Sequence, residues 1–116
     1  MKAIKISGIV IKGDGYGRTL GFPTMNLGTT EEFPMGLKSG VYSGTAVLDN
    51  QNYRAGILIN PEKEGKRKVE AHLIGYAGDA YGKTITLNLE KFLRDYKKFE
   101  TEQELIAQIE KDLKEC

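Results

Sequence analysis

Residues 83–92 read Lys-Thr-Ile-Thr-Leu-Asn-Leu-Glu-Lys-Phe, and this alternation decides the fold. The aliphatic residues fall at every second position: Ile85, Leu87 and Leu89. Because successive side chains of a β-strand point to opposite faces, the pattern predicts a strand with one buried face and one wet face. Strands of this kind are typical of antiparallel sheets.

Four further segments have the apolar, partly β-branched composition of strands: residues 2–12, 40–48, 53–59 and 68–74. Polar residues 49–52 separate the second segment from the third, which is a hairpin signal. Glycine-rich residues 75–82 separate the fourth segment from residues 83–92. We therefore expect two strand pairs and an additional N-terminal strand.

One helix is predicted, at the end of the chain. Thr101-Glu-Gln-Glu104 has capping-box spacing, in which the Thr101 hydroxyl accepts a bond from the Glu104 N–H. Apolar residues then follow at helical spacing: Leu105, Ile106, Ile109 and Leu113. A doubly wound nucleotide-binding fold needs alternating strands and helices and is excluded. A closed antiparallel barrel with the helix packed across it remains.

Size and charge limit the classes of function. The chain has 116 residues, which suits one domain spanning residues 1–116. Its 17 basic and 16 acidic residues give a net charge of +1, so no overall field favours nucleic acid or an anionic membrane. The single cysteine, Cys116, excludes an intrachain disulfide, and no segment approaches the apolar length of a membrane span. We expect a cytoplasmic monomer that binds neither nucleic acid nor membrane.

The stretch most informative about function is residues 13–26, GDGYGRTLGFPTMN. Glycines reach positive φ without steric cost, so Gly13, Gly15 and Gly17 can turn successive backbone N–H groups toward an anion. Arg18 adds a cation to the same loop. The spacing differs from both the P-loop and the dinucleotide G-x-G-x-x-G motif. The loop therefore predicts a phosphate site that works without a helix dipole.

Two neutral oxygen ligands follow this loop. Thr24 and Asn26 stand two residues apart, which places a hydroxyl and an amide carbonyl on the same side of an extended chain. Hard oxygen ligands suit Mg²⁺, with Zn²⁺ or Mn²⁺ as alternatives. Because neither residue is charged, we expect the metal to be held mainly by the phosphates with which it arrives.

These features belong to a set of motifs that together resemble the riboflavin kinase (flavokinase) family. The motifs run in order along nearly the whole chain: the glycine loop with GFPTMN (21–26), SGVY (39–42), Asn60-Pro61, VEAHL (69–73), DAYGK (79–83), LRDYKKF (93–99) and QIEKD (108–112). The resemblance implies a mainly β fold, a six-stranded antiparallel Greek-key β-barrel with a C-terminal α-helix packed on it. It also implies transfer of the γ-phosphate of ATP to the ribityl 5′-hydroxyl of riboflavin, giving FMN and ADP.

The domain is similar to the C-terminal module of bifunctional bacterial riboflavin kinase/FAD synthetases. Those proteins carry an adenylyltransferase module as well, and nothing in these 116 residues resembles that module. We therefore expect a stand-alone kinase whose product is FMN, or a domain excised from a chain in which an adenylyltransferase module is its partner.

Glu70 and His72 share one face of the strand predicted at residues 68–74. The sequence alone leaves open whether that face points into the barrel or to solvent, because a carboxylate inside a closed barrel is costly without a partner or a task. The resemblance favours a functional Glu70, since it matches the catalytic base that would deprotonate the ribityl hydroxyl. His72 has no metal ligands at suitable spacing, and we expect a hydrogen-bonded structural histidine.

The resemblance also assigns residues to the two substrates. The nucleotide would contact Gly13, Gly15, Gly17, Arg18 and Thr24 with its phosphates, and Leu73, Gly75 and Tyr81 with the rest of the molecule. The flavin would contact Arg94, Lys97 and Phe99, because two cations and a ring suit a flavin bearing a 5′-phosphate. Each group also has an interpretation without a ligand. Tyr81 and Gly82 would then only form a tight turn, and Arg94, Lys97 and Phe99 would form a charged loop with one buried phenylalanine.

Two other functions remain open at this point. The first is a catalytically silent flavin or FMN-binding module, against which the intact Thr24, Asn26 and Glu70 argue. The second is a small β-barrel interaction domain in which the glycines only form turns. Nucleotide would not stabilise such a domain, whereas a ligand at a hundredfold its Kd should add roughly 2.7 kcal/mol.

Overall fold

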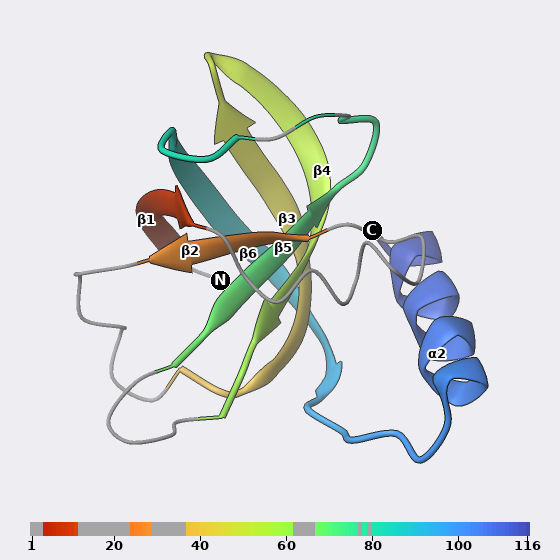
Figure 1. Ribbon diagram of the computed structural model, residues 1–116. Coiled ribbons are helices and arrows are strands. Elements are labelled where there is room, and N and C mark those ends of the chain that lie inside the picture. The colour runs from red at the N-terminus through yellow and green to blue at the C-terminus, as the bar shows by residue number, and fades with distance from the viewer. Residues whose placement is uncertain (1–3, 12–23, 29–36, 62–66, 77, 79) are drawn as a thin grey trace.

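The computed structural model describes residues 4–11, 24–28, 37–61, 67–76, 78 and 80–116. These residues form six strands and one helix: β1 (Ile4–Ile11), β2 (Met25–Gly28), β3 (Gly40–Leu48), β4 (Gln51–Ile59), β5 (Val69–Leu73), β6 (Thr84–Asp95) and α2 (Glu102–Lys114). The strands close into a barrel in the order β1-β2-β5-β4-β3-β6, and every neighbouring pair is antiparallel (Figure 1). The predicted six-stranded antiparallel barrel with a C-terminal helix is confirmed.

The connections of four strands form a Greek key. β3, β4 and β5 are neighbours in sequence and in the barrel, and β6 returns to lie on the other side of β3. This order of three consecutive strands with the fourth beside the first defines the motif. β6 then pairs with β1, so it contributes to closing the barrel.

The interior is filled by the apolar face of each strand. Ile85, Leu87 and Leu89 of β6 are buried, as the alternation predicts, and they belong to the same hydrophobic core as Ile57 and Ile59 of β4. Burying an aliphatic side chain of this size contributes about 1.5–3 kcal/mol. Hydrophobic burial therefore fixes which face of each strand points outward, and the outward faces are those available to ligands.

The β3–β4 hairpin turns more tightly than the sequence suggested. Asp49 and Asn50 have φ of 52° and 63°, and β4 begins at Gln51, directly after them. A two-residue turn with both central residues at positive φ matches the twist of the flanking strands. The predicted turn at residues 49–52 was therefore two residues too long.

β6 extends further than predicted, because it continues through Leu93, Arg94 and Asp95 along β3. The pairing shifts register between Val41 and Tyr42 and again between Ser43 and Gly44. Such irregularities bend a strand and increase its twist. Gly44 is needed there, because a Cβ atom at this position would overlap the backbone carbonyl of Asn88. The sequence had suggested that Arg94 follows the last strand. The structure places it within β6.

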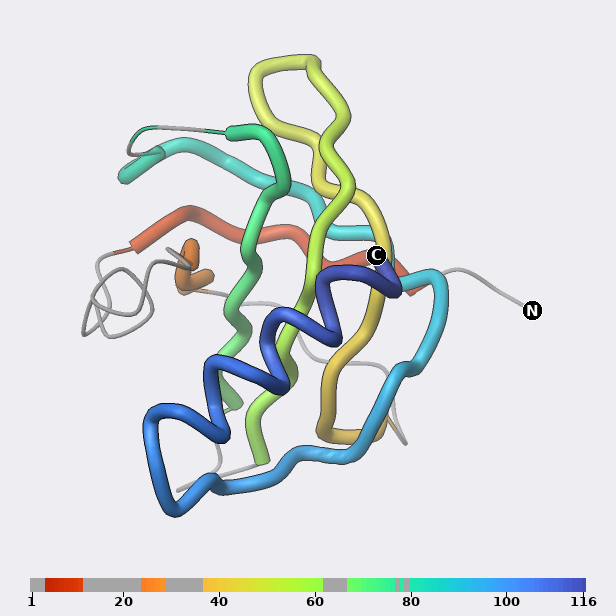
Figure 2. The backbone as a smooth tube through the Cα atoms, turned by 90° about the vertical axis from the view of Figure 1, so that its right-hand side faces the viewer, coloured from red at the N-terminus to blue at the C-terminus, as the bar shows by residue number. Residues whose placement is uncertain are grey.

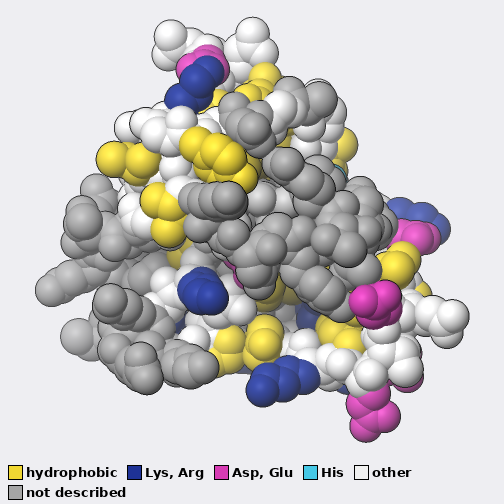
Figure 3. Space-filling model, in the orientation of Figure 1, with side chains coloured by type: hydrophobic (Ala, Val, Ile, Leu, Met, Phe, Trp, Pro, Cys, Tyr) yellow, Lys and Arg dark blue, Asp and Glu magenta, His cyan; other side chains and the backbone are white. Residues whose placement is uncertain are grey.

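Helix α2 lies across the outer side of β4 (Figure 2). Thr101 caps it, with its hydroxyl oxygen 3.2 Å from the Glu104 backbone nitrogen, which confirms this half of the predicted capping box. Gly56 allows the end of the helix to come close, since a Cβ atom there would lie 3.3 Å from Cδ2 of Leu113. The solvent side is charged, and Figure 3 shows acidic side chains over this helix.

Candidate active site

Glu70 lies on the outer face of the barrel. Its neighbours in β5, Val69 and Ala71, are buried in the core, whereas Glu70 is half-buried. It pairs with Asn26 of β2 on one side and with Leu58 of β4 on the other. Directly opposed residues of antiparallel strands share a face, with Cβ atoms about 4.5–5.5 Å apart. The alternative left open by the sequence is thus decided in favour of the outer face.

The Glu70 carboxylate is held at one oxygen. The side-chain Nδ2 of Asn60 donates to Oε2 at 3.0 Å and also to the backbone oxygen of Lys68 at 3.1 Å. Among the described residues, Oε1 of Glu70 has no hydrogen-bond partner. A carboxylate can accept at both oxygens, so within the described part of the chain this group is restrained at one oxygen and unpartnered at the other. Asn60 had been noted only as part of a motif, without a role.

Asn26 lies opposite Glu70 on the neighbouring strand, and Thr24 precedes Asn26 by two residues. Thr24 is exposed and directly precedes β2, and Asn26 is half-buried within it, so both are in or next to extended chain. Both offer neutral hard oxygens, which suit Mg²⁺. In the described part of the chain no group of three His, Cys, Asp or Glu side chains could hold a metal ion alone. The donor set therefore fits a metal ion that brings phosphate ligands with it.

His72 lies next to Glu70 on the same outer face. It is half-buried and opposes Gly56 of β4. That it is no zinc ligand stays a prediction. Its hydrogen-bonded structural role stays a prediction.

The predicted nucleotide residues fall at the end of β5 and in the turn before β6. Gly75 and Gly82 have φ of 86° and 81°, which only glycine adopts readily. Tyr81, in the same turn as Gly82, is exposed, whereas the Leu73 side chain is buried in the core. A contact of Leu73 with nucleotide would therefore use its backbone. Gly13, Gly15, Gly17 and Arg18 lie outside the described residues.

The predicted flavin residues are clustered where β6 meets α2. The ring of Phe99 lies 5.6 Å from Cζ of Arg94 and 5.4 Å from Nζ of Lys97, both within cation–π range. Lys97 is exposed, so its ammonium group is accessible to an anion. The structure thus brings the three predicted residues together.

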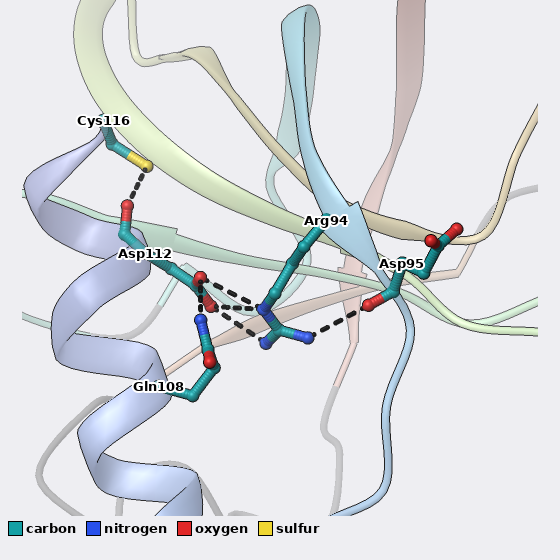
Figure 4. A network of polar contacts seen from close by, with 5 residues as sticks. All are labelled: Arg94, Asp95, Gln108, Asp112 and Cys116. Atoms are coloured by element: carbon teal, nitrogen blue, oxygen red, sulfur yellow. Dashed lines mark hydrogen bonds and ion pairs between the residues drawn. The ribbon is translucent and has the colours of Figure 1, made fainter.

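Arg94 has partners that the sequence analysis missed (Figure 4). Its Nε lies 3.1 Å from both carboxylate oxygens of Asp112, and its Nη2 lies 2.9 Å from Oδ2. Nε2 of Gln108 donates to the same carboxylate at 2.9 Å. The sequence does hold a sign of this contact. Asp112 follows Ile109 by three residues, so it lies on the apolar side of the helix, where an acid needs a partner. The Arg94 guanidinium therefore ties β6 to α2, and its contact with flavin stays a prediction.

Comparison with known proteins identifies the family. The family model Flavokinase, described as riboflavin kinase, matches residues 1–116. The chain belongs to the riboflavin kinase family. A bifunctional riboflavin kinase/FMN adenylyltransferase of Mycoplasma pneumoniae is 36% identical over 109 residues, which are 94% of this chain and 40% of that protein. This member of the family thus spans less than half the length of that relative.

Two solved structures share the fold of this riboflavin kinase family member. A protein of Streptococcus pneumoniae described as a macrolide-efflux protein matches with a TM-score of 0.86 at 29% identity, covering 95% of this chain and 37% of that one. The riboflavin kinase of Trypanosoma brucei matches with a TM-score of 0.73 at 22% identity, covering 98% and 77%. Both place the six-stranded barrel among known folds.

No helix of the described residues is long and apolar enough to cross a membrane.

Proposed function

We propose that this chain is an ATP:riboflavin 5′-phosphotransferase, which transfers the γ-phosphate of ATP to the ribityl 5′-hydroxyl of riboflavin. The family assignment supports this reaction. The single observation that carries it is the outward Glu70 carboxylate, opposite Asn26 of the neighbouring strand, which is bonded at Oε2 and has no partner at Oε1 among the described residues. A general base needs such an open oxygen within reach of the proton that it removes.

In this reaction the 5′-oxygen of riboflavin attacks the γ-phosphorus, and its proton passes to Oε1 of Glu70. The bond between the γ-phosphorus and the bridging oxygen breaks, and its electron pair leaves with ADP. Phosphoryl transfer asks little covalent chemistry of a protein, so positioning and charge neutralisation supply most of the rate. Glu70 would orient the hydroxyl as well as accept its proton.

Thr24 and Asn26 would hold a divalent cation, with Mg²⁺ the first candidate and Mn²⁺ or Zn²⁺ the alternatives. A bound metal ion would neutralise charge on the β- and γ-phosphates. Their neutral oxygens match a metal ion that is delivered with ATP. We therefore expect metal binding to depend on nucleotide.

The substrate contacts are proposed at two places on the barrel, the turn between β5 and β6 and the connection from β6 to α2. The nucleotide would lie toward Gly75 and Tyr81, covered by the loop that contains Gly13, Gly15, Gly17 and Arg18. The flavin would lie toward Lys97 and Phe99, with Arg94 fixed behind them by Asp112. We propose that residues 1–116 act as one domain, and that an adenylyltransferase module is a partner as in the bifunctional Mycoplasma pneumoniae relative.

The test is chromatographic detection of FMN after incubation with riboflavin, ATP and Mg²⁺. Wild-type protein should form FMN, and Glu70→Gln should lose several orders of magnitude in kcat, because the amide cannot accept the proton as a base. Glu110→Gln on the exposed side of α2 is the matched control and should keep full activity. Flavin binding without FMN in the wild type would contradict the kinase and favour a catalytically silent flavin-binding module.

A further inference from the structure

Asn60 lies where the barrel edge meets the chain between β4 and β5. It directly follows Ile59, the last residue of β4, and it is half-buried. Its backbone N–H donates to the backbone oxygen of Lys68 at 3.0 Å, one residue beyond the last strand pair, Ile59 with Val69. The backbone alone therefore already closes this end of the β4–β5 ladder.

The Asn60 side chain makes two further bonds from one nitrogen. Nδ2 donates to the Lys68 oxygen at 3.1 Å and to Oε2 of Glu70 at 3.0 Å. An amide nitrogen carries two hydrogens, so both bonds can form at once. The bond to Lys68 fixes the amide against the backbone, and the second hydrogen is then directed at the carboxylate.

We infer that Asn60 is a positioning residue that holds the Glu70 carboxylate in its reactive orientation. The terminal torsion of a glutamate is broad, so without a partner the carboxylate would rotate freely. The Asn60 bond reaches Glu70 from the β4 side, whereas Asn26 pairs with Glu70 from the β2 side. One oxygen is thereby restrained, while the other has no partner within the residues that the structure describes. This inference rests on the proposed kinase reaction and adds to it a residue that does not touch substrate.

The energetic size of the effect follows from the kind of bond. A hydrogen bond to a charged group contributes about 1.5–3 kcal/mol, which corresponds to roughly a 10- to 100-fold change in rate if it is needed only for catalysis. Asn60→Ala and the similarly sized Asn60→Leu should therefore lower kcat by about 10- to 100-fold. The KM values for riboflavin and ATP should stay within about twofold, because Asn60 acts through Glu70 alone.

The matched control is Asn88→Ala. Asn88 of β6 is also a half-buried asparagine on the outer face, and its Nδ2 donates to Thr45 Oγ1 at 3.2 Å. It loses a side-chain bond of similar geometry on another side of the barrel. Its kcat should equal that of the wild type.

A double-mutant cycle separates positioning from simple stabilisation. In the Glu70→Gln background, Asn60→Ala should lower the residual kcat by less than about twofold, since the group it positions is no longer a base. A merely structural Asn60 would lower kcat by the same factor in both backgrounds, and that result would overturn the inference. Full activity of Asn60→Ala alongside an active wild type would overturn it too and leave the proposed function intact.

A measurement without turnover tests the contact itself. The Tm values of wild type, Asn60→Ala, Glu70→Ala and the double variant should be non-additive, because each single change removes the same hydrogen bond. Strictly additive Tm shifts would refute the contact. Failure of the wild type to form FMN would refute the proposed function and, with it, the catalytic role of Asn60.

Discussion

Breaking the ion pair between Arg94 and Asp112 should cost a large share of the stability of this small domain. Its side chains are only 22% and 11% exposed, and three of its donor–acceptor distances lie between 2.9 and 3.1 Å. Asp112→Ala removes the carboxylate and leaves the Arg94 guanidinium and the Gln108 amide with fewer partners. The perturbation therefore strands a partly buried charge.

The size of the loss can be bounded from these contacts. Removing one partner of a fully buried pair costs about 3–5 kcal/mol. Arg94 is about one-fifth exposed and keeps its Nη1 bond to the Asp95 oxygen at 3.1 Å, so water and this bond offset part of the loss. We expect Asp112→Ala to lower the free energy of unfolding by about 2–3 kcal/mol. For a domain of this size that corresponds to a fall in Tm of roughly 8–12 °C.

The assay is urea unfolding of wild type, Asp112→Ala, Arg94→Met and the double variant. Because both single changes remove the same pair, their costs should not add, and the coupling should be about 1–3 kcal/mol. The exposed pair Lys38–Asp95, at 3.0 Å with side chains 62% and 72% exposed, is the control. Its coupling should be about 0–0.5 kcal/mol, as for other surface pairs. Equal coupling in the two pairs would refute the reasoning from burial.

Two further predictions concern packing and pH. Gly44→Ala should lower the free energy of unfolding in urea by about 2 kcal/mol or more, because its Cβ atom would overlap the Asn88 backbone. Gly56→Ala is the control, since its Cβ atom would meet only the ends of flexible side chains. An equal loss of stability in the two variants would contradict the argument from backbone overlap. Burial raises the pKa of the Cys116 thiol above its ordinary value of 9.0. As pH rises through about 9, the thiol therefore ionises in the unfolded protein before it ionises in the folded protein, and the free energy of unfolding should fall. Cys116→Ser should remove that decline in a series of unfolding curves from pH 7 to 10, and parallel declines in both proteins would exclude the thiol as the cause.

Local patterns were sufficient for much of the fold. The alternation in residues 83–92 and the Thr101 cap of α2 depend on neighbours in sequence, and both were confirmed. The extension of β6 through Arg94 could not be predicted in the same way. Charged residues there are typical of a loop, and only the bulged pairing with β3 keeps them in a strand. Tertiary pairing overrode local composition at that point.

In the candidate site, too, residues within contiguous motifs could be predicted from the sequence, whereas contacts between distant residues could not. Thr24, Asn26 and Glu70 could be named from motifs, because each motif is contiguous. The contacts of Asn60 with Glu70 and of Arg94 with Asp112 join residues 10 and 18 positions apart, across a β-ladder and between a strand and a helix. Strand register and helix placement create these contacts. A polar residue just past a strand end and an acid in an apolar helix stripe were the available signals.

The filled barrel explains why the proposed catalytic residues must face outward. Barrels of about eight strands have an interior just wide enough for side chains, and this barrel has only six strands in the described part of the chain. Its interior positions, such as Ile57, Ile85 and Leu87, have no exposed surface, so no substrate can enter. Glu70 could therefore act as a base only from the outer face. In the proposed reaction, its half-buried position and its bond to Asn60 would orient the carboxylate and leave it within reach of substrate.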